Sequence, residues 1–468
     1  MFRDLSWMRP AGQVPDWAQQ AAFYHIYPYG FLGAPATNDG RSDPVPRLAD
    51  LRQWYDHLSA LGVSVLWLGP VFESRSHGYD TLDYFRIDRR LGDLALFQQV
   101  LDELHQRGFR VLLDGAFHHT SRDFFAFRDL LKNGPRSPYA EWYHVDWQGE
   151  SPYGDGFAYE AWEGHADLPR LNLANSETRG YILEVARMWL ADVGADGWRV
   201  DVAYELEPDF LWELRRACKA ARSDCFLLGE VIHGDYRTWV APDLLDAGTN
   251  YQFNTALWRS FNEGNLWELK AVMERAWHTE WGLYRDIVLL NFLGNHDVTR
   301  ILSRLDDPRH IYPALIVLFT APGIPCLYYG DEVGLTGRKE DGDAALRAPM
   351  PLPSDEWPDA ARDLYRETAR LAHIRRRHPA LVGGRFAALY AGSTGLAFLR
   401  QHSRQVAIVT LNAADAFGML SLPVGREGIP DGTRLRDALE PHDPPFVVEH
   451  GTLTVETPPC WGRILVSG

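Results

Sequence analysis

The chain has 468 residues, of which 46% are hydrophobic and 24% are charged, and its formal net charge at pH 7 is −16. This length accommodates a barrel domain of about 250 residues together with additional domains. The negative charge argues against nucleic acid or an anionic membrane as a partner, because binding a polyanion requires a basic face.

Predicted strands and helices alternate three times in the first part of the chain. Short apolar runs at residues 23–27, 63–68 and 109–113 are typical of strands that are buried on both faces. Apolar residues recur at helical spacing before the second and third runs, and Gly62 and Gly108 are placed to end these helices. The repeated units predict a parallel sheet with helices on its outer side.

The alternation stops after His119, in a segment where Pro, Gly and aromatic residues show no clear period. A structureless loop of this length is improbable in a compact domain, so we interpret it as a small inserted subdomain after the third strand. Beyond Pro379, short alternating strands separated by turn residues predict an antiparallel β-sandwich. The expected parts are a barrel of residues 1–119 and 176–378, an inserted subdomain of residues 120–175, and a C-terminal domain of residues 379–468.

The cysteines and the first residues indicate the cellular setting. The four cysteines form no CxxC motif, which predicts reduced thiols and neither a disulfide framework nor a zinc site. Residues 1–7 lack the basic-then-apolar order of a secretory signal, and no run of 18 apolar residues occurs. We therefore expect a cytoplasmic protein that does not span a membrane.

Four polar segments each follow an apolar, strand-like run, at residues 114–119, 197–201, 229–230 and 295–297. In a parallel barrel the carboxyl ends of the strands meet at one rim, where barrel enzymes carry their catalytic groups. Each acid taken alone could instead cap the helix that follows it. Four such segments in one chain favour an active site built from strand ends.

Three carboxylates lie in constrained surroundings: Asp201 ends Gly-Trp-Arg-Val-Asp, Glu230 lies in Leu-Gly-Glu-Val, and Asp297 ends Leu-Gly-Asn-His-Asp. With residues 77–80 (His-Gly-Tyr-Asp) and 328–332 (Tyr-Tyr-Gly-Asp-Glu), these motifs closely resemble the α-amylase family of retaining glycoside hydrolases, glycoside hydrolase family 13. The resemblance covers roughly residues 16–468 and implies a (β/α)8 TIM barrel.

The resemblance also implies roles for the acids. Asp201 is expected to be the nucleophile and Glu230 the general acid, a pair of carboxylates that retaining glycosidases hold about 5 to 5.5 Å apart. Asp297 is expected to bind sugar hydroxyls and to favour ring distortion. Arg199, on the same strand face as Asp201, is expected to pair with the nucleophile and keep it ionised.

The remaining substrate-binding residues expected from the family are Tyr79, beneath the sugar ring, and His119 and His296, which donate to its hydroxyls. Two positions depart from the family pattern. His118 replaces the usual Asn ligand of a structural calcium, and imidazole is a poor calcium ligand, so we expect no metal and no required cofactor. Ser76 replaces an Asp that exo-acting α-glucosidases commonly carry, which argues against a strict α-glucosidase.

Residues 168–172 (Leu-Pro-Arg-Leu-Asn) and His233 are similar to the neopullulanase, cyclomaltodextrinase and maltogenic amylase group. Tyr204 and Ile232 stand where that group commonly has Asn and Trp, beside the leaving-group subsites. Only about 20 residues precede the first predicted strand, so we expect the chain to lack the N-terminal domain of that group.

The leading hypothesis is a hydrolase of short maltooligosaccharides or related α-glucosides, with transglycosylation as an open further activity. A glucosyltransferase or isomerase that forms trehalose or another disaccharide is the alternative, because it would use the same glycosyl-enzyme intermediate. A non-catalytic carbohydrate-binding member is disfavoured because all three carboxylates are present. The sequence leaves linkage preference and oligomeric state open.

Overall fold

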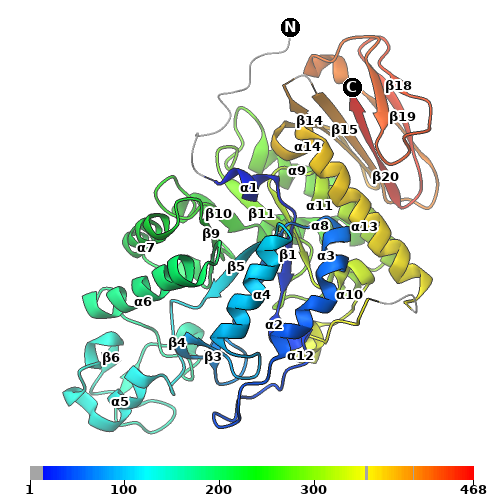
Figure 1. Ribbon diagram of the computed structural model, residues 1–468. Coiled ribbons are helices and arrows are strands. Elements are labelled where there is room, and N and C mark those ends of the chain that lie inside the picture. The colour runs from blue at the N-terminus through cyan, green and yellow to red at the C-terminus, as the bar shows by residue number, and fades with distance from the viewer. Residues whose placement is uncertain (1–13, 354–356, 404, 468) are drawn as a thin grey trace.

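The structure is a computed structural model that describes residues 14–353, 357–403 and 405–467 (Figure 1). Its centre is a closed barrel of eight parallel strands. The barrel strands, in the order in which they neighbour one another, are β1 (Phe23–Ile26), β12 (Ile324–Tyr328), β11 (Val288–Phe292), β10 (Ala247–Thr249), β9 (Phe226–Gly229), β8 (Gly197–Val200), β5 (Arg110–Gly115) and β2 (Val65–Leu68).

Helices surround the barrel on its outer side (Figure 1). The apolar faces of these helices and the outward side chains of the strands form one large buried cluster. The main helices are α3 (Tyr55–Leu61), α4 (Leu94–Gln106), α6 (Ser176–Met188), α7 (Pro208–Ala221), α8 (Tyr251–Asn262), α9 (Leu266–Trp277), α11 (Ile311–Thr320) and α13 (Asp359–Arg377). The shorter helices are α1 (Asp16–Gln20), α2 (Pro28–Phe31), α10 (Ile301–Arg304), α12 (Asp343–Leu346) and α14 (Pro379–Gly383).

The inside of the barrel is filled by inward side chains such as Phe23, Leu112, Phe226 and Leu290, all without solvent exposure. The strands are therefore apolar on both faces, as the runs in the sequence predicted. Acidic residues lie at or directly after the carboxyl ends of β5, β8 and β9, at Asp114, Asp201 and Glu230.

Two additions interrupt the barrel pattern near its carboxyl rim. A hairpin of β3 (Phe72–Ser74) and β4 (Thr81–Ile87) follows β2 and was not predicted from the sequence. The segment between β5 and α6 contains α5 (Phe125–Asn133) and a pair of two-residue strands, β6 (Val145–Asp146) and β7 (Ala158–Tyr159). This segment projects from the barrel (Figure 1).

The C-terminal part is antiparallel. Six strands form one sheet in the order β13-β14-β15-β20-β17-β18, and β16 pairs with β19 in a second sheet. Their bounds are β13 (Arg385–Ala391), β14 (Gly395–His402), β15 (Gln405–Asn412), β16 (Gly418–Leu422), β17 (Arg434–Asp437), β18 (Phe446–Val447), β19 (Leu453–Thr457) and β20 (Trp461–Ser467). The predicted fold class, a parallel barrel followed by an antiparallel sheet domain, is confirmed.

Within the described ranges, no helix is both long enough and apolar enough to cross a membrane.

Gly197 shows how closely the strands that carry the polar segments approach one another. A Cβ atom at this position would lie 2.1 Å from the carbonyl oxygen of Phe226, on the neighbouring strand β9. The register of β8 against β5 and β9 aligns Arg199 with Asp114 and Val200 with Gly229. Asp201 and Glu230 therefore follow their strands at the same level of the barrel.

We predict that Gly197→Ala lowers the free energy of unfolding by about 1–3 kcal/mol or more, because β8 and β9 must separate to admit the methyl group. Gly180→Ala is the matched control, since no atom lies within 4 Å of a Cβ at Gly180 in α6. It should raise stability by about 0.5–1 kcal/mol, because alanine favours a helix. Urea denaturation of both variants measures the difference, and equal stabilities would contradict the tight β8–β9 approach.

Candidate active site

One arginine binds the acids at the carboxyl ends of β5, β8 and β9. Arg199 donates through Nη1 to Asp201 Oδ1 and to Asp114 Oδ1, both at 2.7 Å. Its Nη2 atom lies 2.6 Å from Glu230 Oε1. Since Arg199 is only 1% exposed, a single buried guanidinium holds three carboxylates together. The predicted Arg199–Asp201 pair is present, whereas the contacts with Asp114 and Glu230 were not predicted.

The charge balance of this group favours proton retention. Burial raises the pKa of Asp201 well above its usual value, and the negative charges of Glu230 and Asp114 add to the increase, while Arg199 opposes it. Three buried acids that face a single arginine carry an excess of negative charge, which a proton would reduce. A pair of carboxyls with one protonated and one ionised member is the arrangement needed for acid-assisted bond cleavage.

Glu230 is fixed by the backbone as well as by Arg199. Its Oε2 atom accepts a hydrogen bond from the Val202 N–H at 3.0 Å, and the residue is 5% exposed. Val202 has a φ of 49°, a left-handed conformation that is costly for a β-branched residue. The turn after Asp201 therefore aims a backbone donor at Glu230.

Asp297 faces the same rim from the loop after β11. Its Oδ1 atom accepts from Arg347 Nη2 at 3.0 Å, and its Oδ2 atom lies 3.0 Å from His296 Nε2. Burial would raise the pKa of Asp297, but His296, Arg347 and Arg199 outweigh it and hold that pKa below its usual value. Asp297 is thus ionised at neutral pH and suited to accept hydrogen bonds from hydroxyl groups.

Arg347 also belongs to the site, although the sequence patterns did not identify it. It follows the short helix α12, beyond β12, and no motif marks it there. Besides Asp297, it donates through Nε to the backbone oxygen of His296 at 3.1 Å and lies over the ring of Tyr27.

Tyr79 and His296 lie beside the carboxylates. The Tyr79 hydroxyl donates to Asp114 Oδ2 at 2.9 Å and lies 2.5 Å from His296 Nε2. The two rings are nearly parallel, at 10° and 5.3 Å between centroids. The structure therefore brings Tyr79 and His296 to the predicted site, with Tyr79 held by Asp114.

His119 faces the inserted segment. Its ring stacks against Trp162 at 5.9 Å, and its Nδ1 atom lies 3.3 Å from that of His118. Burial lowers the pKa of His119 well below its usual value, so its imidazole is neutral. Its Nε2 atom is buried and has no hydrogen-bond partner within the protein, so its hydrogen-bonding capacity is unused in this structure.

Three of the positions that depart from the family pattern, His118, Ser76 and Tyr204, contact neighbouring polar or aromatic side chains. Burial lowers the pKa of His118 to about 3, and its Nε2 atom lies 3.3 Å from Glu205 Oε2. The Ser76 hydroxyl donates to Asp80 Oδ2 at 2.6 Å. Tyr204 contacts the ring of His233, at 5.0 Å between centroids.

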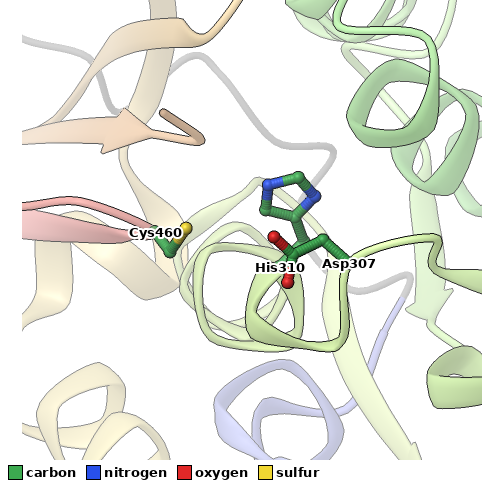
Figure 2. Close-up of side chains that lie close together, drawn as sticks. All are labelled: Asp307, His310 and Cys460. Carbon is green, nitrogen blue, oxygen red and sulfur yellow. The ribbon is translucent and has the colours of Figure 1, made fainter. Parts of the chain in front are cut away.

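Among the residues that the structure describes, one set of His, Cys and Asp side chains is close enough to be compared with a metal site. Asp307, His310 and Cys460 have possible ligand atoms within 4.8 Å of one another (Figure 2). His310 Nε2 lies 3.0 Å from the Ala413 carbonyl oxygen, and the Asp307 carboxylate accepts hydrogen bonds from Arg309. A cation would have to displace these contacts and face Arg309, so the arrangement does not favour a metal.

The chain resembles known carbohydrate-active enzymes over most of its length. The model of the α-amylase catalytic domain matches residues 25–373. A cyclomaltodextrinase from a Bacillus species is 35% identical over 425 residues, covering 86% of this chain and 74% of that enzyme. Neopullulanase 2 of Thermoactinomyces vulgaris is 34% identical over 382 residues, covering 77% of this chain and 64% of that enzyme.

Solved structures agree with these relatives. The cyclic α-maltosyl-(1→6)-maltose hydrolase of Arthrobacter globiformis, in complex with its named ligand, superposes with a TM-score of 0.79 at 29% identity. That comparison covers 97% of this chain and 100% of the other.

We predict that Arg199→Leu lowers the free energy of unfolding by about 3–5 kcal/mol, because it leaves buried carboxylates without their cation. The loss should be larger at pH 8 than at pH 5. Carboxyls whose pKa is raised in the folded state stabilise it at low pH, and this contribution is lost as the pH rises through the raised pKa. Removing Arg199 raises the pKa of Asp201 further and so strengthens this dependence.

Urea denaturation at both pH values measures the effect, with Arg338→Leu as a control, because Arg338 is exposed in the loop that leads to Arg347. An equal loss at pH 5 and pH 8 would count against the role of Arg199 as the charge partner of this cluster.

Proposed function

The chain belongs to the α-amylase family of glycoside hydrolases, and from this we propose that it hydrolyses short maltooligosaccharides and related α-glucosides by double displacement. The observation that carries the proposal is the pair of carboxyls, Asp201 and Glu230, on two nitrogens of the buried Arg199 guanidinium. Because both carboxyls bind the same guanidinium, they lie close together. This favours the short carboxyl–carboxyl distance of a retaining enzyme over the longer distance that lets an inverting enzyme place a water molecule between its carboxyls.

In the first step, Asp201 attacks the anomeric carbon while Glu230 gives its proton to the leaving glycosidic oxygen. In the second step, Glu230 takes a proton from water, which attacks the anomeric carbon and releases Asp201. Arg199 stabilises the charge of Asp201 as it leaves. Asp297, kept ionised by His296 and Arg347, accepts hydrogen bonds from ring hydroxyls and favours the distorted sugar.

Tyr79, His119 and His296 complete the proposed sugar site. The ring of Tyr79 offers an apolar face to the sugar, and its hydroxyl is occupied by Asp114. His119 is neutral, so its free Nε2 atom can donate to or accept from a hydroxyl. Since His119 stacks on Trp162, we place the inserted segment over one side of the bound oligosaccharide.

The substrate class is supported by the relatives, whose names specify cyclomaltodextrinase, neopullulanase and cyclic α-maltosyl-(1→6)-maltose hydrolase activities. We therefore include cyclic maltooligosaccharides among the proposed substrates. An intracellular maltogenic amylase of Bacillus subtilis, 33% identical over 350 residues, supports a cytoplasmic location.

We also propose that the reaction needs no calcium or other cofactor. His118 is uncharged at neutral pH and is in contact with Glu205. A neutral imidazole is a weak ligand for a hard cation that prefers oxygen. Activity should therefore be unchanged by EDTA, and a loss that calcium restores would refute this part of the proposal.

Incubation with maltotriose and a cyclodextrin should release reducing sugars, and NMR should detect the α-anomer of the new reducing end first. Pullulan, sucrose and trehalose in the same panel define linkage preference. Longer products, or trehalose, without a proportional release of reducing ends would favour a glucosyltransferase or isomerase. No turnover of any substrate would favour the non-catalytic alternative.

Glu230→Gln should lower kcat on maltotriose by about 10²- to 10⁴-fold, because the leaving oxygen loses its proton donor. Glu207→Gln, a change at an exposed acid that precedes α7, should leave kcat unchanged. With an α-glycosyl fluoride, whose leaving group needs little acid assistance, the Glu230→Gln variant should accumulate a covalent sugar on Asp201. Mass spectrometry of the labelled peptide identifies the residue, and a sugar on any other side chain would disprove the assignment.

A further inference from the structure

The Tyr251 hydroxyl lies between the segments that carry Glu230 and Asp297. It is 3.4 Å from Glu230 Oε1, and it accepts a hydrogen bond from Asn295 Nδ2 at 2.9 Å. Tyr251 is the first residue of α8, directly after β10 and the cap residue Asn250. No sequence motif distinguished it, and the mechanism above does not use it.

The direction of these hydrogen bonds is fixed by Asn295. Its Oδ1 atom accepts from the backbone N–H groups of Asp297 at 2.8 Å and Val298 at 3.1 Å. Its Nδ2 group must therefore be the side that faces Tyr251, and an amide NH₂ can only donate. The Tyr251 hydroxyl uses its oxygen for Asn295, so its proton is available to Glu230.

Tyr251 stays protonated in this place. Burial raises the pKa of Tyr251 well above its usual value, and the neighbouring charges of Glu230 and Asp297 raise it further, against Arg199 and Asn295. The hydroxyl therefore keeps its proton and remains a hydrogen-bond donor at neutral and acidic pH.

The position of the ring is set by the strand that leads to Asp297. Tyr251 meets Phe292 of β11 edge to face, at 76° and 4.9 Å between ring centroids. Asn250 donates to Asn291 Oδ1 at 2.8 Å, and Asn254 donates to the Leu293 carbonyl oxygen at 2.8 Å. The start of α8 is therefore tied to β11, and the hydroxyl moves with the Asp297 segment.

Among the residues that the structure describes, the two other donors to Glu230 come from β8, which lies on the opposite side of β9 from β10. Val202 N–H and Arg199 Nη2 both belong to the β8 segment that carries Asp201. Tyr251 is the donor through which the β10–β11 side of the barrel reaches Glu230. Catalytic hydrogen bonds that are long in an empty site commonly shorten when substrate is bound, so 3.4 Å is compatible with such a role.

We propose that Tyr251 is a positioning residue, whose hydroxyl orients the Glu230 carboxyl toward the leaving oxygen and links that orientation to Asp297 through Asn295. The inference rests on the proposed role of Glu230 as the acid. Tyr251 exchanges no proton with substrate. Its effect is confined to the steps in which Glu230 gives or takes a proton.

The test compares Tyr251→Phe with the wild type on two substrates that share a donor sugar. With maltotriose, whose leaving group needs a proton, kcat/KM should fall about 10-fold, the loss expected for one hydrogen bond to an ionisable group. With α-maltosyl fluoride, kcat/KM should stay near the wild-type value, because it reports only steps up to departure of a fluoride that needs little acid.

Tyr236→Phe is the matched control. The Tyr236 hydroxyl accepts from the backbone N–H of Gln252 at 3.3 Å, at the start of the same helix, and the variant should not change the ratio between the two substrates. Asn295→Ala provides a second variant, because it removes the donor that orients Tyr251. It should lower kcat/KM on both substrates, because it also removes the acceptor of the Asp297 and Val298 N–H groups. The ratio between the two substrates in the double variant should equal the ratio in Tyr251→Phe alone.

If Tyr251→Phe loses kcat/KM equally on both substrates, or on neither, the proposed role of Tyr251 is overturned. The proposed function stays intact in that case, provided the wild type is active. A wild type that cleaves neither substrate would overturn the proposed function and this role with it. Circular dichroism of each variant establishes that the compared proteins are folded.

Discussion

The buried guanidinium of Arg199 is the contact on which the rest of the site depends. Asp114, Asp201 and Glu230 converge at the end of an apolar barrel, where uncompensated negative charge is strongly unfavourable. Arg199 meets all of them and packs over the ring of Trp67, at 5.3 Å from its centroid. The positions of these acids relative to one another are therefore fixed before any substrate arrives.

Two buried acids at opposite ends of the barrel, Asp196 and Asp201, differ in how completely they are paired. At the amino ends of the strands, Asp196 accepts from His105, Arg110 and the backbone N–H of Val111. Burial would raise the pKa of Asp196, but these donors outweigh it and lower that pKa. At the carboxyl ends, by contrast, three acids share one arginine and the pKa of Asp201 is raised. The fully paired Asp196 stabilises the fold, whereas the incompletely paired Asp201 lies in the candidate active site, where perturbed pKa values are common.

The sequence predicted the parts of the molecule that local patterns determine. Buried strands leave continuous apolar runs, the motifs around Glu230 and Asp297 follow two of them, and Asp201 ends the strand motif Gly-Trp-Arg-Val-Asp, so the barrel and these segments could be predicted. The sequence did not reveal Arg347 or Tyr251, because each reaches the site through contacts across loops far apart in the chain. The β3–β4 hairpin was missed because its short strands lie within a single connection.

The left-handed turn at Val202 has a consequence for how this site can change during evolution. One of the donors that hold Glu230 is a main-chain N–H group, which every amino acid except proline supplies. Side chains around Glu230 can therefore differ between relatives while this main-chain hydrogen bond is kept. Alanine scanning, which removes side chains only, leaves it in place, and a single backbone ester replacing the amide nitrogen of residue 202 is the substitution that would expose its contribution.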